Sequence, residues 1–332
     1  MRDRRSTAYS REEPTKDDDG PFDGIEPGGV TPTEAFSILG NETRVAILQA
    51  LWEGEGPMSF SELRNAVGVD KGNFNYHLGE LSHFVRQRDE TYELREAGKQ
   101  VLRAVIAGAI TEAPSFGPTR IDHRCPYCGG PVELSYQEEV FTARCTRCVG
   151  AVRGETYPRG TFLRYALPPA SLEDRTPEEV LAVAHRLYDG KITAMIEGVC
   201  SECAGVVGFS VDACPDHDAS GRELCATCGT RHSVWVEACC ENCRYARQFV
   251  LWFAVVTNPA VVAFYHDHGA PWNRVPFAKL TRENARYVSD ISEEVLSREP
   301  FRARVAIQLG DDEIHVTVDD DLEVIDATRD DA

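Results

Sequence analysis

The stretch CPYCGGPVELSYQEEVFTARCTRC, residues 125–148, carries the clearest structural signal in the chain. Two Cys-x-x-Cys pairs bracket two short runs, PVELSYQ and VFTAR, with a turn between them. This pattern predicts a β-hairpin, which brings the second pair back beside the first. Two residues between ligands let one tight turn hold one face of a tetrahedral metal ion, and two such turns close the shell. We expect a zinc ribbon at residues 120–153, with a structural zinc bound by Cys125, Cys128, Cys145 and Cys148.

Residues 200–243 contain four more pairs with the same two-residue spacing. Of the twelve cysteines in the chain, only Cys239 falls outside these pairs. Paired cysteines in a chain without an export signal are typical of metal ligands in a reducing cytoplasm. Together with the first site, they predict three structural zinc ions. The further expected ligands are Cys200, Cys203, Cys214, His217, Cys225, Cys228, Cys240 and Cys243.

An internal repeat raises the question of which pairs share a metal. CSECAGVVGFSVDAC (200–214) aligns without a gap on CATCGTRHSVWVEAC (225–239). Sequential pairing joins 200/203 to 214/217 and 225/228 to 240/243, whereas crossed pairing joins 200/203 to 225/228 and 214/217 to 240/243. An extended run of eight residues spans roughly 26 Å, too far for both ends to hold one metal ion. This favours the crossed order, with Cys239 as an alternative ligand to Cys240 because it aligns with Cys214.

Charge and composition restrict the protein class less sharply. The chain has 332 residues, room for about two domains, and a net charge of −19. Only five of its 35 basic residues are lysines. Abundant Asp and Glu with scarce Lys resembles the proteins of salt-accumulating archaea, in which acidic surfaces maintain solubility. The same acidity also fits a protein that avoids nucleic acid.

No stretch of the sequence predicts export or membrane insertion. The N-terminal residues 1–30 are charged, rich in Gly and Pro, and predict a disordered tail without a signal peptide. The most apolar run, residues 249–265, is shorter than the roughly 20 residues of a membrane span and is interrupted by Asn258-Pro259. We expect a buried helix or helix pair there, and a cytoplasmic protein.

Residues 31–113 follow the order helix, helix, helix, hairpin, helix. Asn41 caps NETRVAILQALWEG, which places Val45, Leu48, Leu51 and Trp52 on one face. Ser59 and Glu62 form a capping box ahead of the second helix, which Gly68 ends, and Asp70 caps the third. VRQRDETYEL (85–94) then predicts a hairpin, and REAGKQVLRAVIAGAI (95–110) a last amphipathic helix. This order is that of a winged helix-turn-helix.

Two stretches of this region resemble ArsR-type regulators. ILGNETRVAILQAL (38–51) is similar to their first conserved stretch, and FSELRNAVGVDKGNFNYHLGEL (60–81) to their helix-turn-helix. The remainder of the chain resembles haloarchaeal regulators that append a zinc-binding region. The resemblance implies binding of double-stranded DNA, a homodimer and possible contact with the transcription machinery. It does not imply metal sensing, because ELRNAV (62–67) lacks the cysteine pair of the metal-sensing members.

The expected DNA-reading surface lies on the third helix and the hairpin. Phe74, Leu78 and Leu81 recur at helical spacing and are assigned to the core, and His77 to its boundary. In a helix-turn-helix the outer face of this helix enters the major groove. Asn73 and Asn75 would read adenine edges, Tyr76 a phosphate or thymine methyl, Lys71 a phosphate, and Arg86 and Arg88 backbone or minor groove.

The whole chain is therefore expected to be an α+β protein with a winged helix-turn-helix followed by a zinc ribbon and a zinc-stabilised domain at 161–330. That domain should contain a long helix from Thr176 and a β-meander over 302–326. These features favour a DNA-binding transcription regulator and not an enzyme. Two alternatives stay open: a zinc-ribbon scaffold that binds only protein, since residues 70–89 hold three basic and three acidic side chains, or a zinc enzyme with an open metal position near His266 and His268.

Overall fold

The computed structural model describes residues 29–125, 128–151, 157–218, 224–270 and 291–330. It is a mixed α+β structure in which every sheet is antiparallel. Two compact units divide it, Met1–Arg103 and Ala104–Ala332. The predicted tail at 1–30 lies outside the described residues except for its last two positions.

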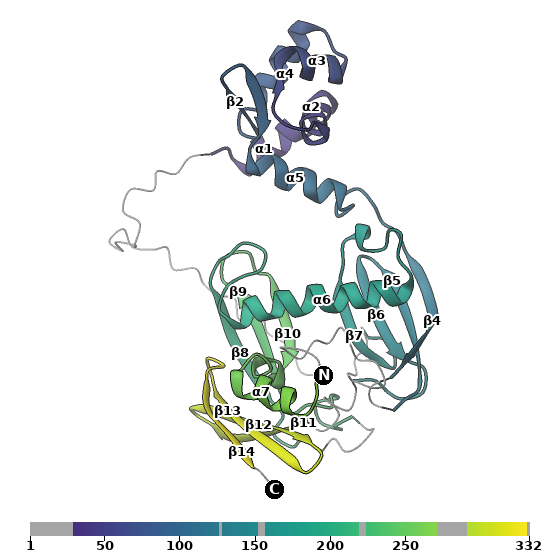
Figure 1. The fold of residues 1–332 in the computed structure, drawn as a ribbon, viewed down its shortest axis with the longest axis vertical. Helices are drawn as coiled ribbons and strands as arrows, with labels where there is room; N and C mark the ends of the chain where they lie inside the picture. Colours follow the sequence, from purple (N-terminus) through teal and green to yellow (C-terminus); the bar gives the residue numbers. More distant parts are fainter. Residues whose placement is uncertain (1–28, 126–127, 152–156, 219–223, 271–290, 331–332) are drawn as a thin grey trace, which may run out of the picture. The chain divides into compact units, whose positions relative to one another are not determined.

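The first unit is mainly helical, with one small sheet (Figure 1). Its strands, in the spatial order β1-β3-β2, pair antiparallel, and β2 and β3 form the predicted hairpin. Its elements are α1 (Pro32–Leu39), α2 (Glu42–Glu53), β1 (Met58–Ser59), α3 (Phe60–Val67), α4 (Lys71–Glu80), β2 (Val85–Arg88), β3 (Thr91–Leu94) and the start of α5 (Glu96–Ile106).

The helix boundaries of this unit follow the predicted caps. The Asn41 side chain accepts from the Arg44 amide at the start of α2, and Ser59 and Glu62 form a complete capping box on α3. Gly68 ends α3 in the left-handed region at φ 76°, where glycine is tolerated without strain. Asp70 accepts from the Asn73 amide at the start of α4. The sequence prediction of these ends is confirmed.

The core of the first unit differs from the prediction on one helix. Leu48, Leu51, Phe74, Leu78 and Leu81 are buried as expected, whereas Val45 is only partly buried and Trp52 is exposed. The buried stripe of α2 consists of Arg44, Ile47, Leu48 and Leu51, which is the i, i+3, i+4, i+7 pattern. The predicted face was therefore rotated, because an arginine at position 44 was not recognised as a core-facing residue.

Arg44 joins three parts of this unit. Its guanidinium donates to the carbonyls of Ile38 and Ser37 at the end of α1, at 3.2 and 3.5 Å, and pairs with the Glu80 carboxylate of α4 at 3.1 Å. It also lies 5.9 Å from the ring centroid of Tyr76. One buried side chain thus satisfies the C-terminal carbonyls of α1 and fixes the end of α4 against α2.

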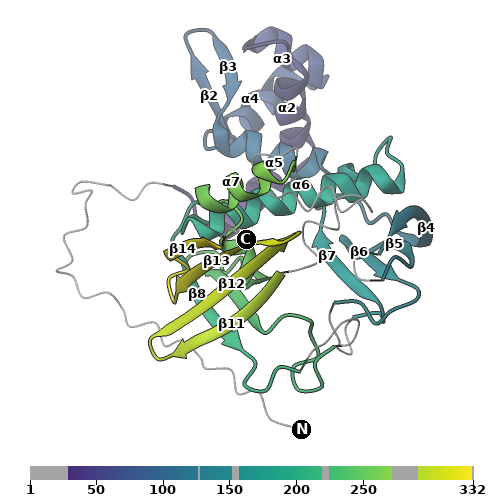
Figure 2. The same cartoon turned by 60° about the horizontal axis from the view of Figure 1, so that its bottom comes forward.

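The second unit contains three further sheets (Figure 2). The spatial orders are β4-β5-β6-β7, β10-β9-β8 and β11-β12-β13-β14. The strands are β4 (Phe116–Arg124), β5 (Pro131–Gln137), β6 (Val140–Cys145), β7 (Thr161–Ala166), β8 (Val207–Ala213), β9 (Val234–Cys240), β10 (Ala246–Val250), β11 (Ile291–Arg298), β12 (Phe301–Leu309), β13 (Asp312–Asp319) and β14 (Val324–Asp330). The helical elements are η1 (Pro169–Ser171), α6 (Pro177–Ile196), η2 (Leu251–Ala254) and α7 (Pro259–Asp267).

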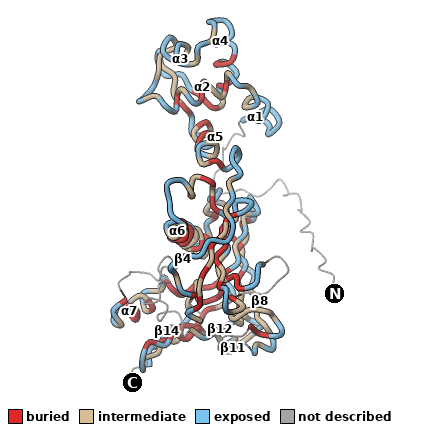
Figure 3. Tube along the Cα trace, turned by 90° about the vertical axis from the view of Figure 1, so that its right-hand side faces the viewer, coloured by how far each residue is buried: buried red, intermediate tan, exposed pale blue. Residues whose placement is uncertain are grey.

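Helix α6 contributes to both cores of this unit. Its first half buries Val180, Leu181 and Ala184 against the β4–β7 sheet, and its second half buries Ile192 and Met195 with the other two sheets. Tyr188 between them packs against both clusters. The predicted cap is present, since Thr176 and Glu179 form a capping box with Pro177 at the first turn. Figure 3 shows buried positions running along α6 and the central strands.

The apolar run 249–265 is core rather than membrane segment. It forms the end of β10, then η2 and α7, and contributes Phe249, Leu251, Trp252 and Phe264 to the larger cluster. The expected helix or helix pair is thus replaced by a strand, a 3-10 turn and one α-helix. None of the helices in the described ranges is long and apolar enough to cross a bilayer. The predicted meander over 302–326 is present and gains β11 as a fourth strand.

Replacing Arg44 with Leu should lower the stability of the first unit by about 1–3 kcal/mol, because two carbonyls and the Glu80 carboxylate lose their buried donor. Urea denaturation followed by far-ultraviolet circular dichroism measures the change. Arg95→Leu, at an exposed arginine just before α5, is the control and should shift the midpoint little. Equal stability of the two variants would contradict the joining role of Arg44.

Candidate metal centres

The first group of metal ligands lies at the end of the hairpin where β5 begins and β6 ends. Register pairs Val132 with Cys145, so the turn before β5 and the turn after β6 meet at one end of the hairpin. The Cys125 and Cys148 Sγ atoms are 3.7 Å apart, and those of Cys128 and Cys145 3.5 Å. Zinc–sulfur bonds of about 2.3 Å in a tetrahedron separate neighbouring sulfurs by roughly 3.8 Å. The four thiols therefore already have the spacing of a tetrahedral metal shell.

Two further groups lie at opposite ends of the β8–β9 hairpin. One contains Cys200, Cys203, Cys240 and Cys243, and the other Cys214, His217, Cys225 and Cys228. In the first of these, Cys200 and Cys243 Sγ are 3.6 Å apart and Cys203 and Cys240 Sγ 3.5 Å. In the second, Cys214 and Cys225 Sγ are 3.9 Å apart. Within the described residues, all twelve predicted ligands thus fall into three groups of four.

Neither pairing considered from the sequence is observed. The structure nests one site inside the other: the first pair joins the last, and the two middle pairs join each other. The reason is that β8 and β9 pair antiparallel, with Val207 opposite Cys240 and Ala213 opposite Val234. The start of β8 therefore lies beside the end of β9. The length argument correctly separated the two ends of β8, but the crossed order was wrong.

Four of the cysteine turns share one backbone conformation. In each, the first cysteine amide donates to the carbonyl five residues later, as from Cys125 to Gly130 and from Cys200 to Gly205. The fifth residue of the turn has positive φ in all four, and it donates back to the first cysteine carbonyl. Such a turn points successive amides toward the sulfurs, which stabilises thiolates. These turns begin at Cys125, Cys200, Cys225 and Cys240.

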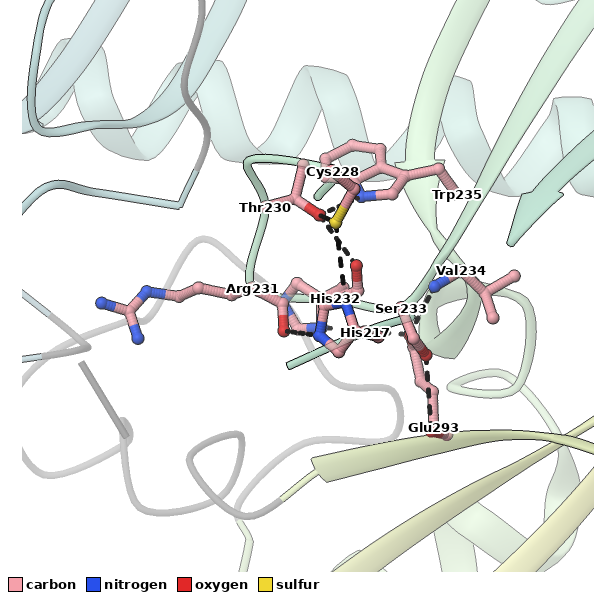
Figure 4. Close-up of polar contacts among 9 residues, drawn as sticks. All are labelled: His217, Cys228, Thr230, Arg231, His232, Ser233, Val234, Trp235 and Glu293. Carbon is pink, nitrogen blue, oxygen red and sulfur yellow. Dashed lines mark hydrogen bonds and ion pairs between the residues drawn. The ribbon is translucent and has the colours of Figure 1, made fainter. Parts of the chain in front are cut away.

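In the histidine-containing group, polar contacts hold both ring nitrogens of the imidazole (Figure 4). His217 Nδ1 lies 3.5 Å from Cys228 Sγ, and its Nε2 lies 3.2 Å from the Arg231 carbonyl oxygen. With Nε2–H donating to that carbonyl, Nδ1 is the nitrogen available to a metal ion. Thr230 extends these contacts, because its hydroxyl lies 3.2 Å from Cys228 Sγ and accepts from the Trp235 indole.

A buried carboxyl group connects this site to the C-terminal sheet. Glu293 on β11 accepts from the Val234 amide at 3.1 Å and from the Ser233 hydroxyl at 3.3 Å (Figure 4). Burial raises the pKa of Glu293 to about 7, against the opposing effect of these hydrogen bonds, and burial lowers the pKa of His232 to about 4. His232, whose Nδ1 is 3.9 Å from Glu293, is therefore neutral near neutral pH. The sequence offered no sign that Glu293 reaches this turn.

The remaining candidate ligands do not join these groups. Cys239 lies outside them, and Cys240 rather than Cys239 belongs to the ligand group. His268 contacts the Phe264 carbonyl and Asp312 at 2.7 and 3.0 Å, while the His266 side chain is 83% exposed. They share no metal-like cluster within the described ranges. In a looser group on β13 and β14, His315 Nε2 lies 3.3 Å from the Glu313 carboxylate on its own strand and 3.3 Å from the Asp330 carboxylate on the neighbouring strand.

The six predicted DNA contacts are all exposed but are not equally available. Lys71, Asn73, Asn75 and Tyr76 project from α4 while Phe74 and Leu78 are buried. On the hairpin, Arg86 and Arg88 both pair with Glu93, at 2.8 and 3.2 Å. Sequence reasoning missed this shared partner, although Glu93 lies opposite Arg86 in the register.

Elemental analysis of purified protein should find three metal ions per chain, and pairs of substitutions should reveal the pairing. Cys200→Ser with Cys240→Ser removes ligands from one nested site and should leave two ions. Cys200→Ser with Cys225→Ser affects two sites and should leave one. The crossed order gives the reverse result, and Cys239→Ser should retain all three ions.

Two different family models match the chain, one in each part. Residues 32–105 match a family described as a domain of unknown function (DUF7347). No curated protein and no solved structure matches the chain. Residues 122–324, which include all three metal-ligand groups, match a second such family. The chain belongs to this second family, described as a domain of unknown function (DUF7351).

Proposed function

We propose that the protein is a transcription regulator that binds duplex DNA through a winged helix-turn-helix formed by its first unit. The supporting order is α2, β1, α3, α4, then the β2–β3 hairpin and α5. Helices α3 and α4 are joined by a tight turn that contains Gly68 and Asp70. This order supports a helix, turn, helix and wing arrangement, in which the second helix of the motif enters the major groove.

The observation that carries the proposal is the division of α4 into two faces. Phe74, His77 and Leu78 pack inward, whereas Asn73, Asn75 and Tyr76 face solvent. Asparagine amides match the donor and acceptor pattern of adenine in the major groove, and tyrosine contacts phosphate or methyl groups. Tyr76 is 59% exposed on this face, and its ring also lies 5.9 Å from the Arg44 guanidinium.

Electrostatics are arranged to limit repulsion at this surface. Glu80 at the end of α4 is paired with Arg44, so its carboxylate is compensated. The wing arginines share Glu93, and one guanidinium must exchange this partner for a phosphate on binding. We therefore assign base contacts to α4 and weaker, sequence-independent contacts to the wing.

We further propose that the three ligand groups hold zinc in a structural role, the first of them as a zinc ribbon. Four thiolates, or three with one imidazole, fill a tetrahedral shell and leave no position for a reactive water. Each group lies at the end of a β-hairpin where it fastens two chain segments. A pre-formed shell rarely exists in an unfolded chain, so metal binding and folding of this unit are linked.

A homodimer is the proposed assembly. No residue of α1 is buried, and the Phe36 ring on it is 77% exposed. Related winged helices dimerise through their first and last helices, which corresponds to α1 and α5. The balance of charges around α4 favours a protein-binding scaffold as the second candidate function, because phosphate binding ordinarily uses a basic face.

Asn75→Ala and Tyr76→Ala should each cost about 1–3 kcal/mol of binding at the preferred site, because they remove base contacts. Arg86→Ala or Arg88→Ala should weaken binding to all sequences alike. Fluorescence anisotropy in molar KCl, with duplexes recovered from DNA bound in cells, measures both. Gln49→Ala, at an exposed position of α2, is the control. Unchanged affinity of the Asn75, Tyr76 double variant would exclude α4 as the reading helix.

Chelation should unfold residues 120–330 while the first unit stays folded, because its apolar core contains no metal ligand. A fragment of residues 31–113 should fold without zinc and retain weak DNA binding. Circular dichroism and DNA titration of one sample during chelation provide the test. A metal-free protein that stays fully folded but changes its DNA affinity would show that zinc is a sensed ligand instead.

A further inference from the structure

The segment that forms the β4–β7 sheet and its loops contains more arginines than acidic residues, in contrast to the chain as a whole. The described residues between 116 and 166 contain six arginines and four acidic residues, whereas the whole chain carries a net charge of −19. Two of the four acidic residues, Glu138 and Glu139, lie in the β5–β6 turn. That turn is the far end of the hairpin from Cys145, roughly 17 Å away along the strand.

Five of these arginines have no acidic partner in the described part of the chain. Arg144 pairs with Glu133 at 2.7 Å, but none of the others forms a salt bridge there. All five are exposed, and only one makes a side-chain contact with a neighbour, a cation–π contact with Tyr157. We call these five residues the arginine set: Arg120, Arg124, Arg147, Arg159 and Arg164.

Strand register places part of the set on the outer face of the sheet. Arg120 lies opposite Glu133, which lies opposite Arg144, and Arg164 lies opposite Thr142. Cross-strand partners share a face, and alternate residues along a strand do too. The outer face therefore carries Arg120 and Arg164 on its edge strands and the paired Arg144 and Glu133 between them, with Asp122 two residues from Arg120 on β4. The inner face carries the buried Val132, Leu134, Tyr136, Phe141 and Ala143.

Two other members flank the metal ligands. Arg124 directly precedes Cys125, and Arg147 lies between Cys145 and Cys148. A metal ion held by four thiolates is net negative, so charge compensation is an alternative explanation for arginines here. In the described residues, however, the Cys145 sulfur is stabilised by the backbone amides of Arg147 and Cys148, and no guanidinium donates to a ligand sulfur.

We propose that the arginine set is a second DNA-contact surface, which binds the phosphate backbone of duplex DNA. The proposal rests on the proposed DNA-binding function and supplies the basic surface that α4 and its wing lack. Guanidinium groups suit phosphate because they donate two parallel hydrogen bonds. Four strands span about 14 Å, which is the scale of a few successive phosphates of one DNA strand. The contact is independent of base sequence.

The test measures how DNA affinity depends on salt in the full-length, metal-loaded protein. Arg120, Arg147 and Arg164 are replaced together by Gln, and binding to a fluorescein-labelled mixed-sequence duplex is titrated across a KCl series. Each lost phosphate contact reduces the slope of log K against log salt by about 0.9, so the slope should become shallower by about 2 to 3. Replacing the same residues by Lys keeps the charges and should retain the wild-type slope.

The control is a variant with the same change in charge elsewhere in the second unit, Arg186, Arg244 and Arg302 all replaced by Gln. These three are exposed and form no salt bridge in the described residues. Their slope should equal that of wild type. Metal content and circular dichroism confirm that each variant is folded.

A Gln variant that behaves like the control overturns the proposal. If Asn75→Ala with Tyr76→Ala still changes sequence preference in that case, the proposed function stands without the second surface. A changed slope with no effect of the α4 variant supports the arginine set and rejects α4 as the reading helix. A wild-type protein that binds no duplex at any salt concentration rejects both.

Discussion

The antiparallel pairing of β8 with β9 determines how the second unit is held together. Once Val207 lies opposite Cys240, the ends of the hairpin are fixed, and each end gathers one complete set of four ligands. A metal ion bound by each group would then brace the two ends of the same pair of strands. Glu293 attaches one end to the C-terminal sheet through Val234 and Ser233. The strand register, and not the ligand spacing alone, therefore determines which four residues form each ligand group.

Local features of the fold were predictable because neighbouring residues determine them. Caps at Asn41, Ser59, Asp70 and Thr176 depend on groups three residues away, and four of the cysteine turns share one conformation that is closed within six residues. The α+β character follows from the same local patterns. These predictions needed no knowledge of which distant segments meet.

What failed depended on contacts between distant segments. The repeat 200–214 and 225–239 suggested two equivalent units, but its alignment does not record that β8 pairs with β9 in the nested register. Arg44 is buried because it meets α1 carbonyls and Glu80, which is 36 positions later. Glu293 approaches Ser233 across 60 positions. Polarity suggested exposure for Arg44 and Glu293, and only their partners explain burial.

The arginines of the chain differ in whether they have a carboxylate partner. Arg44 and Arg144 each have a carboxylate of their own within hydrogen-bonding distance, and Arg86 and Arg88 share one, so these pairs reduce the positive field outside the protein. The arginine set has none in the described residues, and its charge is available to a partner. In an acidic chain, net charge is therefore a poor guide to local charge, because guanidinium groups without a carboxylate partner gather on one segment of the second unit. A polyanion is attracted to such a surface only over short distances, because salt at about 0.1 M screens exposed charges beyond roughly 10 Å.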